Sequence, residues 1–365
     1  MNNFLSVIRA FSLEGTLLEA TPYGCGHINH TYRLRVEQNG CEKQYILQKI
    51  NAGIFKDIAG LMNNIQLISA HIRNGKAGSD AERCALSIVP TKEGSLFYQA
   101  EDGACYRIYR FIEHTVTLQS VSCHDDFETL GRAFGEFQNQ LSDFDASLLV
   151  ETIPHFHHTV KRFEALEEAI RQNLAGRADT VAEEIAFARA RKDDAARLLT
   201  LWQNGQLPLR VTHNDTKLNN VLFDETTHEA VCIVDLDTVM PGFVHYDFGD
   251  SIRFGASTAA EDEKDLSKVT MDLSLFEAYT RGFLSACGKA LTETEVDQLA
   301  FSAKLLTYEC GIRFLTDYLN GDTYFRIHYP EQNLDRCRTQ FKLVSDMEVK
   351  MTAMEDIVRR LSPAR

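Results

Sequence analysis

The sequence predicts an α+β protein with two lobes, a smaller one built on an antiparallel sheet and a larger, mainly helical one. Two observations lead to this fold class. Segments with the alternating pattern of half-buried strands gather in the first 112 residues. After residue 113, apolar residues recur at the helical steps of three and four. Since the chain has 365 residues, about two domains of ordinary size are expected, and we place them at residues 1–112 and 113–365.

In the first lobe, the clearest element is a hairpin. Residues 31–36 alternate as a strand does, residues 44–50 form its partner, and the Asn39-Gly40 pair between them is a strong hairpin signal. A helix is expected over residues 54–72. Shorter strands are expected at residues 85–89, 95–98 and 105–111.

In the second lobe, the best-marked element is a helix whose apolar face carries Phe127, Leu130, Phe134, Phe137 and Leu141. A long helical stretch is predicted over residues 181–202, short strands and loops over 207–236, and helices from 273 to the end. The three histidines at 155, 157 and 158 have a spacing that suits no familiar metal site, so we interpret them as the start of a helix.

Composition narrows the function. The chain carries 38 Lys+Arg against 52 Asp+Glu, a net charge of −14, which argues against a nucleic-acid partner but leaves room for a local nucleotide pocket. The nine cysteines never form a CxxC pair, which indicates free thiols in a reducing compartment. Neither a signal peptide nor an apolar run of about 18 residues is seen, so we expect a cytoplasmic protein without a membrane span. No obligate protein partner is implied.

The most informative stretch is residues 213–220, with the form H-x-D-x-K-x-x-N, followed by an apolar strand at 231–234 that ends in Asp235 and Asp237. Phosphoryl transfer needs a carboxylate beside the attacking hydroxyl, oxygen ligands for Mg²⁺ and a cation near the moving phosphate. H-x-D or D-x-D alone is common in caps and turns. The combined pattern is far rarer and favours a kinase.

Together with several other stretches, this pattern resembles the aminoglycoside phosphotransferase and choline kinase group, which has a protein-kinase-like fold. These stretches are residues 23–29, 45–48, 111–115, 209–220, 247–258 and 309–313. The resemblance implies a nucleotide-binding first lobe, a catalytic and acceptor-binding second lobe, ATP as donor, Mg²⁺ and a small-molecule acceptor. Its narrower form is to the N-acetylhexosamine 1-kinases of the group, which implies transfer to the anomeric 1-hydroxyl of an N-acetylated sugar. Choline, homoserine or an aminoglycoside is the alternative acceptor.

The resemblance implies roles for the central motif. Asp215 is expected to orient the acceptor hydroxyl, and Lys217 to lie near the transferred phosphate unless it is a surface lysine. Asn220 and Asp235 are the expected Mg²⁺ ligands, with Asp237 either beside the metal or in contact with the sugar. The intact set argues against a non-catalytic nucleotide-binding relative.

Two more residues are expected to support the catalytic loop. His213 braces it through hydrogen bonds. Asp247 begins a literal D-F-G, but no apolar strand directly precedes it. We therefore assign the metal role to Asp235 and a supporting role to Asp247.

The nucleotide is expected at a turn with Gly24, Gly26 and Asn29, where glycines let the backbone approach phosphates closely. Gln48 stands where many relatives carry a basic residue, and the adjacent Lys49 faces the other side of its strand. Since the helix at 54–72 has no Glu, the usual Lys–Glu pair is in doubt. The hinge that binds adenine is expected at Arg110, Phe111, Ile112 and Glu113.

For the sugar, the resemblance points to five residues beside Asp215. They are His27, Asn214, Asp237, Arg313 and Tyr324. Arg313 lies among apolar helical residues and is either a sugar contact or a structural salt-bridge partner. Tyr324 follows the turn at Asn320-Gly321-Asp322, and loops often carry binding residues.

Overall fold

The computed structural model describes residues 2–24, 28–76, 80–118 and 123–363. Its contacts divide the chain into two compact units. The first unit comprises Met1–Thr117, Phe144–Pro154 and Val221–Met240, and the second comprises Leu118–Asp143, His155–Asn220 and Pro241–Arg365. The units therefore do not follow a single cut after residue 112, because two later segments pack with the first one.

An antiparallel sheet forms the body of the first unit, as predicted. Its order is β1-β2-β3-β6-β4, with β5 also paired to β6. The strands are β1 (Thr16–Pro22), β2 (His30–Gln38), β3 (Cys41–Ile50), β4 (Ile88–Val89), β5 (Tyr98–Gln99) and β6 (Cys105–Arg110). The predicted hairpin is confirmed: Asn39 and Gly40 have φ of 51° and 79° between β2 and β3, as a tight primed turn requires.

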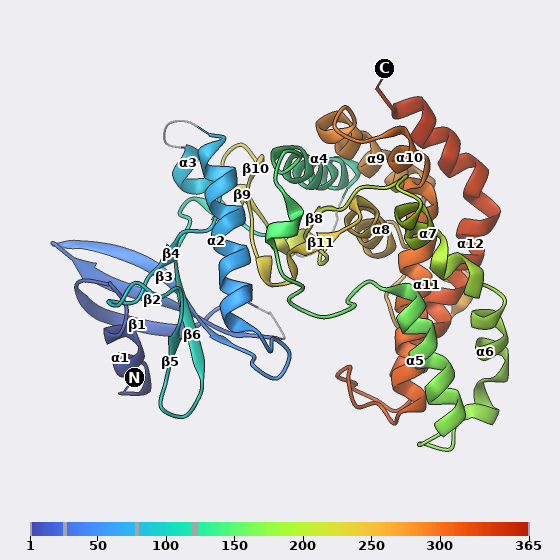
Figure 1. Cartoon of the computed structure of the whole chain (residues 1–365), viewed down its shortest axis with the longest axis horizontal. Helices are drawn as coiled ribbons and strands as arrows, with labels where there is room; N and C mark the ends of the chain where they lie inside the picture. Colours follow the sequence, from blue (N-terminus) through green and yellow to red (C-terminus); the bar gives the residue numbers. More distant parts are fainter. Residues whose placement is uncertain (1, 25–27, 77–79, 119–122, 364–365) are drawn as a thin grey trace. The chain divides into compact units, whose positions relative to one another are not determined.

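The two faces of this sheet differ in chemistry because successive strand residues point to opposite sides. Leu47 and Ile108, directly paired across β3 and β6, join the buried cluster that α1 (Asn2–Arg9) completes with Val7 and Ile8. The next pair along, Gln48 and Arg107, faces the other side. That side is covered by α2 (Ile58–Asn74), which runs beside the sheet in Figure 1.

A smaller sheet, in the order β10-β9-β7, completes the first unit. It contains β7 (Thr115–Val116), β9 (Val221–Asp224) and β10 (Ala230–Ile233). After β10 the chain turns through Asp235, whose φ is +59°, into the short 3₁₀ helix η5 (Leu236–Thr238). Asn64 of α2 donates to the carbonyl of Val239, 3.0 Å away, and thereby fixes the end of this turn.

Helices dominate the second unit, as predicted. They include α4 (His124–Gln140), α5 (Thr159–Gln172), α8 (Val244–Gly255), α9 (Leu273–Cys287), α10 (Glu293–Asp297), α11 (Leu299–Leu319) and α12 (Gln332–Leu361). The helix predicted from Phe127 to Leu141 is α4, and it lies beside α9 (Figure 1). Gly282 permits this close approach, since a Cβ there would lie 1.9 Å from the carbonyl oxygen of Glu128.

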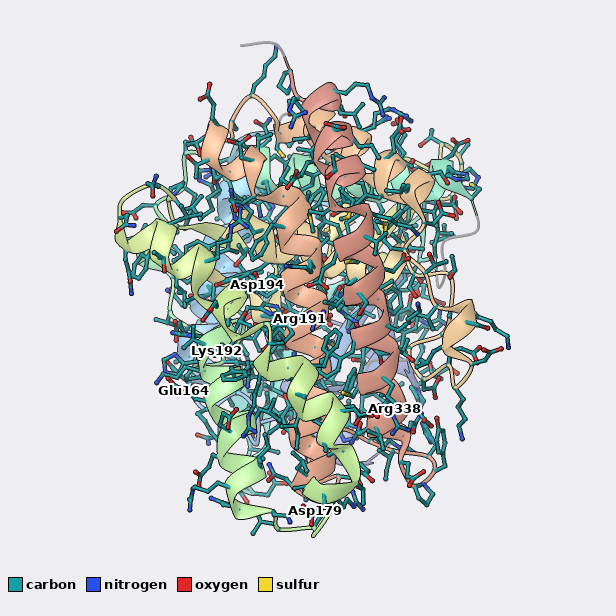
Figure 2. The ribbon with its side chains drawn as sticks, turned by 90° about the vertical axis from the view of Figure 1, so that its right-hand side faces the viewer. Glu164, Asp179, Arg191, Lys192, Asp194 and Arg338 are labelled. Atoms are coloured by element: carbon teal, nitrogen blue, oxygen red, sulfur yellow. The ribbon has the colours of Figure 1, made fainter. Side chains whose placement is uncertain are left out.

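The helical stretch predicted over residues 181–202 is confirmed, but it is divided. It contains η2 (Ala178–Val181), α6 (Ala182–Arg189), η3 (Lys192–Ala196) and α7 (Arg197–Gln203). Two charge pairs lie at the break between α6 and α7: Arg191 binds Glu348 at 2.7 Å, and Asp194 binds Lys304 at 2.8 Å. Figure 2 labels Arg191 and Asp194 at this break. Helix propensity cannot reveal such partners, which lie more than 100 residues away.

Two global expectations can be compared with the described residues. Within them, no helix is both long and apolar enough to cross a membrane. The eight described cysteines are all free thiols.

Candidate functional site

The H-x-D-x-K-x-x-N motif forms a loop in the second unit between β8 (Arg210–Thr212) and the short 3₁₀ helix η4 (Leu218–Asn220). The loop brings three predicted side chains together. The two Asp215 carboxylate oxygens are engaged separately: Oδ1 lies 2.7 Å from Nζ of Lys217, and Oδ2 accepts from Nδ2 of Asn220 at 3.2 Å. Both contacts join residues no more than five positions apart in the sequence.

The charge of Lys217 is maintained by its neighbours. Burial lowers the pKa of Lys217, but the charge of Asp215 and its hydrogen bond, helped by Asp250, raise it above the ordinary value. The ammonium therefore stays protonated at neutral pH. Its side chain is nevertheless 42% exposed, so it can reach a ligand in solvent.

The backbone of the loop is held by hydrogen bonds to the buried carboxylate of Asp247 in α8. Oδ2 of Asp247 accepts from the backbone N–H of His213 at 2.9 Å, and Oδ1 accepts from that of Asn214 at 2.8 Å. Gln138 of α4 donates a third hydrogen bond, at 2.9 Å. Burial raises the pKa of Asp247, although the His213 ring and these donors counteract it in part. The contacts are those expected of a supporting residue.

His213 and Asn214 complete the support of the loop. The buried His213 ring packs against Phe134 and Phe137 and accepts at Nδ1 from the backbone N–H of Asp215, 3.3 Å away. Asn214 adopts φ of +65°, a left-handed conformation that costs free energy in a non-glycine residue. Such a conformation persists where surrounding contacts enforce it, and Asp215 follows it directly.

One of these contacts comes from His157, which was predicted only to lie at the start of a helix. His158 does cap α5, accepting from the N–H of Lys161. The buried His157, however, lies 3.3 Å from the Asn214 carbonyl through Nε2 and 2.7 Å from Oε1 of Glu309 through Nδ1. Burial opposes the Glu309 charge, yet His157 and Arg313 leave the pKa of Glu309 lowered.

Arg313 follows Glu309 by one turn of α11. Its guanidinium carbon lies 5.6 Å from the Phe156 ring centroid and 5.5 Å from that of Phe325. Among the ion pairs of the described residues, none includes Arg313, which leaves its donors for a ligand. The assignment of Arg313 to the sugar stays a prediction, and a structural role beside the buried Glu309 is its alternative.

Tyr324 stands on a loop next to these rings and is 65% exposed. The loop is held by the buried carboxylate of Asp317 in α11. Asp317 accepts from three consecutive backbone N–H groups, those of Thr323, Tyr324 and Phe325, at 2.8–3.0 Å. The exposed ring is therefore carried on a well-fixed backbone.

In the first unit, the predicted residues Gln48 and Asp237 both contact Arg107, for which no role was predicted. Its guanidinium is 1% exposed and binds Asp237 with two nitrogens, Nη1 at 2.6 Å from Oδ1 and Nη2 at 2.9 Å from Oδ2. Its Nε donates to Oε1 of Gln48 at 2.9 Å. Burial acts against the Arg107 charge, but Asp237 holds the pKa of Arg107 above its ordinary range. Lys49, one residue along β3, lies on the other face.

Asn29 joins the same cluster. Its Nδ2 donates to Oδ2 of Asp237 at 2.6 Å, and its Oδ1 accepts from the backbone N–H of Asn51 at 3.0 Å. Nearby, Gly24 has φ of +75°, which a side chain would disfavour. The remaining predicted residues of this turn, Gly26 and His27, lie outside the described residues.

The expected hinge continues from the end of β6. Arg110 and Phe111 donate their backbone N–H groups to the Ser87 and Gln44 carbonyls, at 2.9 and 3.2 Å. Phe111 also packs edge-on against Tyr23, which precedes Gly24, with ring centroids 5.9 Å apart. Ile112 is buried, and Glu113 is exposed. The first unit thus brings Phe111 of the predicted hinge into contact with the residue that precedes Gly24.

The chemistry of the two predicted metal ligands suits Mg²⁺, which prefers hard oxygen donors and needs only one or two from the protein when phosphates and waters supply the rest. The amide nitrogen of Asn220 is used by Asp215, and within the described chain no donor approaches its Oδ1. That oxygen is available to a cation. Asp235 belongs to the first unit and Asn220 to the second. No three His, Cys, Asp or Glu side chains of the described ranges form a metal-binding group by themselves.

Comparison with known proteins agrees with this fold. Residues 19–279 match the phosphotransferase enzyme family. The microcompartment-associated aminopropanol kinase is 15% identical, with a TM-score of 0.65 over 97% of this chain and 98% of the other. An aminoglycoside phosphotransferase from Alicyclobacillus acidocaldarius is 12% identical, with a TM-score of 0.60 over 98% and 96%. A spectinomycin phosphotransferase in complex with ADP and spectinomycin is 14% identical, with a TM-score of 0.51 over 92% of each. The chain shares their protein-kinase-like fold.

Proposed function

Because this chain belongs to the phosphotransferase enzyme family, we propose that it transfers the γ-phosphoryl group of ATP to the anomeric 1-hydroxyl of an N-acetylhexosamine, giving the sugar 1-phosphate and ADP. The observation that carries the phosphoryl-transfer part is the loop in which Asp215, Lys217 and Asn220 meet within hydrogen-bond distance. A carboxylate, a fixed cation and an amide oxygen are the groups that this reaction uses.

Asp215 orients the acceptor hydroxyl and takes its proton as the bond to phosphorus forms. The transition state of phosphoryl transfer is loose in most descriptions, so alignment matters more than base strength. The supports from Asp247 and His157 therefore act on the rate, because they set the backbone on both sides of Asp215. Lys217, which pairs with Asp215 without a ligand, supplies positive charge to the transferred phosphate.

Asn220 and Asp235 would hold Mg²⁺, which when bound neutralises the phosphate oxygens and so favours attack on phosphorus. In the first unit, the turn at Gly24 and the hinge at Arg110–Glu113 are the proposed contacts to the phosphates and the adenine. Gly26 belongs to the same proposed turn.

The sugar assignment is supported by the resemblance and by the surface around Arg313 and Tyr324. Arg313 offers donors between two aromatic rings, and the fixed loop carries the exposed Tyr324 ring. Guanidinium donors suit sugar hydroxyls and an N-acetyl carbonyl better than a cationic acceptor, because like charges repel. His27, Asn214 and Asp237 are the other proposed sugar contacts. Choline, homoserine and aminoglycosides remain the alternative acceptors.

The direct experiment measures ADP release with Mg-ATP over a panel of acceptors. It contains N-acetylglucosamine, N-acetylgalactosamine, glucose, choline, homoserine, 1-amino-2-propanol and kanamycin. Turnover should be greatest with the acetylated sugars, and the product should be alkali-stable but acid-labile, as an anomeric phosphate is. Turnover with choline, the amino alcohol or kanamycin but not with the acetylated sugars would contradict the sugar assignment and leave the kinase assignment standing.

A second experiment tests the proposed role of the Asp215 carboxylate. Asp215→Asn should lower kcat by orders of magnitude while Mg-ATP still binds, because the amide cannot accept the proton. Asp145→Asn, at an exposed 3₁₀-helix cap in the first unit, is the control and should leave kcat unchanged. If the Asp215 variant stays within a few fold of wild type, another group performs this role.

A further inference from the structure

Arg107 and Asp237 form a buried ion pair whose place in the first unit is hard to explain by stability alone. Both side chains are almost fully buried, at 1% and 5% exposure. Removing two charges from water costs more than most ion pairs return, and well-packed apolar residues are often as stable. A pair of this kind is therefore weak evidence for a purely stabilising role.

The contacts of the pair connect segments far apart in the chain. Arg107 lies on β6 and donates to Gln48 on β3, and Gln48 donates in turn to Thr31 Oγ1 on β2 at 3.0 Å. These three residues are directly opposite one another across the strands. The guanidinium thus projects from the rigid centre of the sheet, where its orientation is fixed before any ligand binds.

The acceptor of this guanidinium lies in the turn that follows β10. Arg107 occupies both carboxylate oxygens of Asp237, and Asn29 donates a third contact to Oδ2. Asp237 is two residues from Asp235, whose left-handed backbone begins the turn. One carboxylate therefore joins the turn of the proposed metal ligand to the turn of the proposed phosphate-binding segment.

We propose that Arg107 is a positioning residue that orients Asp237 and through it holds the Asn29 and Asp235 turns in the arrangement that binds a nucleoside diphosphate with a divalent cation. This inference rests on the proposed function. Gln48 occupies the β3 position and Lys49 faces the opposite side, so the buried cation beside Gln48 is Arg107 of β6.

The test is the binding of Mg-ADP to the full-length protein by calorimetry, which needs no acceptor and no turnover. Arg107→Met should weaken Mg-ADP by about 10- to 100-fold, the effect typical of residues that orient metal ligands. The Mg²⁺ concentration needed for half-maximal ADP binding should rise as well. Arg107→Lys keeps the charge but cannot bind Asp237 with two nitrogens and Gln48 with a third. It should fall between wild type and Arg107→Met.

The double variant Arg107→Met/Asp237→Leu separates positioning from stability. Replacing both charges by apolar groups should restore thermal stability relative to Arg107→Met, because no charge is left buried alone. If Mg-ADP affinity stays low while stability returns, the pair positions the turns. If affinity returns together with stability, the pair is only structural and the proposal is overturned.

Arg73→Met is the matched control. Arg73 is a partly buried arginine of the same unit whose guanidinium donates to the Leu86 carbonyl and to Ser87 Oγ. Its loss should lower stability without changing Mg-ADP affinity, and an equal loss of affinity would count against a specific role for Arg107. Should Arg107→Met not fold, Arg107→Lys is compared with wild type, and unchanged affinity would overturn the proposal. A wild-type protein that does not bind Mg-ADP would overturn the proposed function itself, whereas failure of the acetylated sugars alone would leave this test intact.

Discussion

Asp247→Asn is the variant that most directly examines how the catalytic loop is held. The carboxylate accepts two hydrogen bonds at Oδ2, from His213 N–H and Gln138, and one at Oδ1, from Asn214 N–H. An asparagine can keep only one oxygen. Its better orientation places the amide nitrogen at the Oδ1 position, so that only the Asn214 N–H loses its acceptor.

The expected cost follows from that count. One buried N–H without an acceptor costs about 1–3 kcal/mol, and the two remaining bonds weaken because their acceptor is no longer charged. We therefore expect Asp247→Asn to lower the free energy of unfolding by about 2–4 kcal/mol. Because Asn214 precedes Asp215 and adopts φ of +65°, kcat/KM should fall as well. Asp265→Asn, at an exposed 3₁₀-helix cap, should change stability by less than about 1 kcal/mol.

Urea unfolding measures the free energy, and amide hydrogen exchange reports on the backbone of the loop. The N–H groups of His213 and Asn214 should exchange faster in Asp247→Asn than in wild type, because their acceptor is altered. Unchanged exchange at both amides, with a free energy of unfolding within about 0.5 kcal/mol of wild type, would refute the reasoning.

Three further predictions concern single residues. Burial lowers the pKa of His245 to about 4 from its ordinary 6.5. The stability that the neutral ring contributes is therefore complete above pH 6.5, and about 3 kcal/mol of it is lost as the pH falls towards 4. In urea unfolding, His245→Gln should flatten this pH dependence, and equal slopes for variant and wild type would contradict the prediction. Glu309→Gln removes the carboxylate that binds His157 at 2.7 Å. This variant should lower the free energy of unfolding by about 1–3 kcal/mol and should also lower kcat. A loss of stability with unchanged kcat would show that the His157–Glu309 pair does not affect catalysis. Gly282→Ala places a Cβ against the Glu128 carbonyl and should cost at least about 1–3 kcal/mol in thermal or urea unfolding; a neutral effect would mean that α4 and α9 can move apart.

The sequence predicted those parts of the fold whose signals are local. The hairpin at Asn39-Gly40 and the α4 helix are predicted from residues close together in the sequence, and both are present. The helical stretch predicted over 181–202 is also present, but its division between α6 and α7 was not predicted. The partners of Arg191 and Asp194 at this break, Glu348 and Lys304, are distant in the chain. A propensity sum over a window contains no information about such partners.

The candidate site divides in the same way. Asp215, Lys217 and Asn220 lie within six residues, so the sequence by itself predicted that these side chains meet, and they do. Their catalytic roles stay a proposal, and the backbone that carries them is held by the distant Asp247. Arg107 and His157 were missed. Arg107 meets Asp237 across 130 residues, and His157 meets Glu309 across 152. Only tertiary structure decides such pairs, because a charge is buried where its partner compensates the loss of water, and sequence spacing does not tell which partner that is.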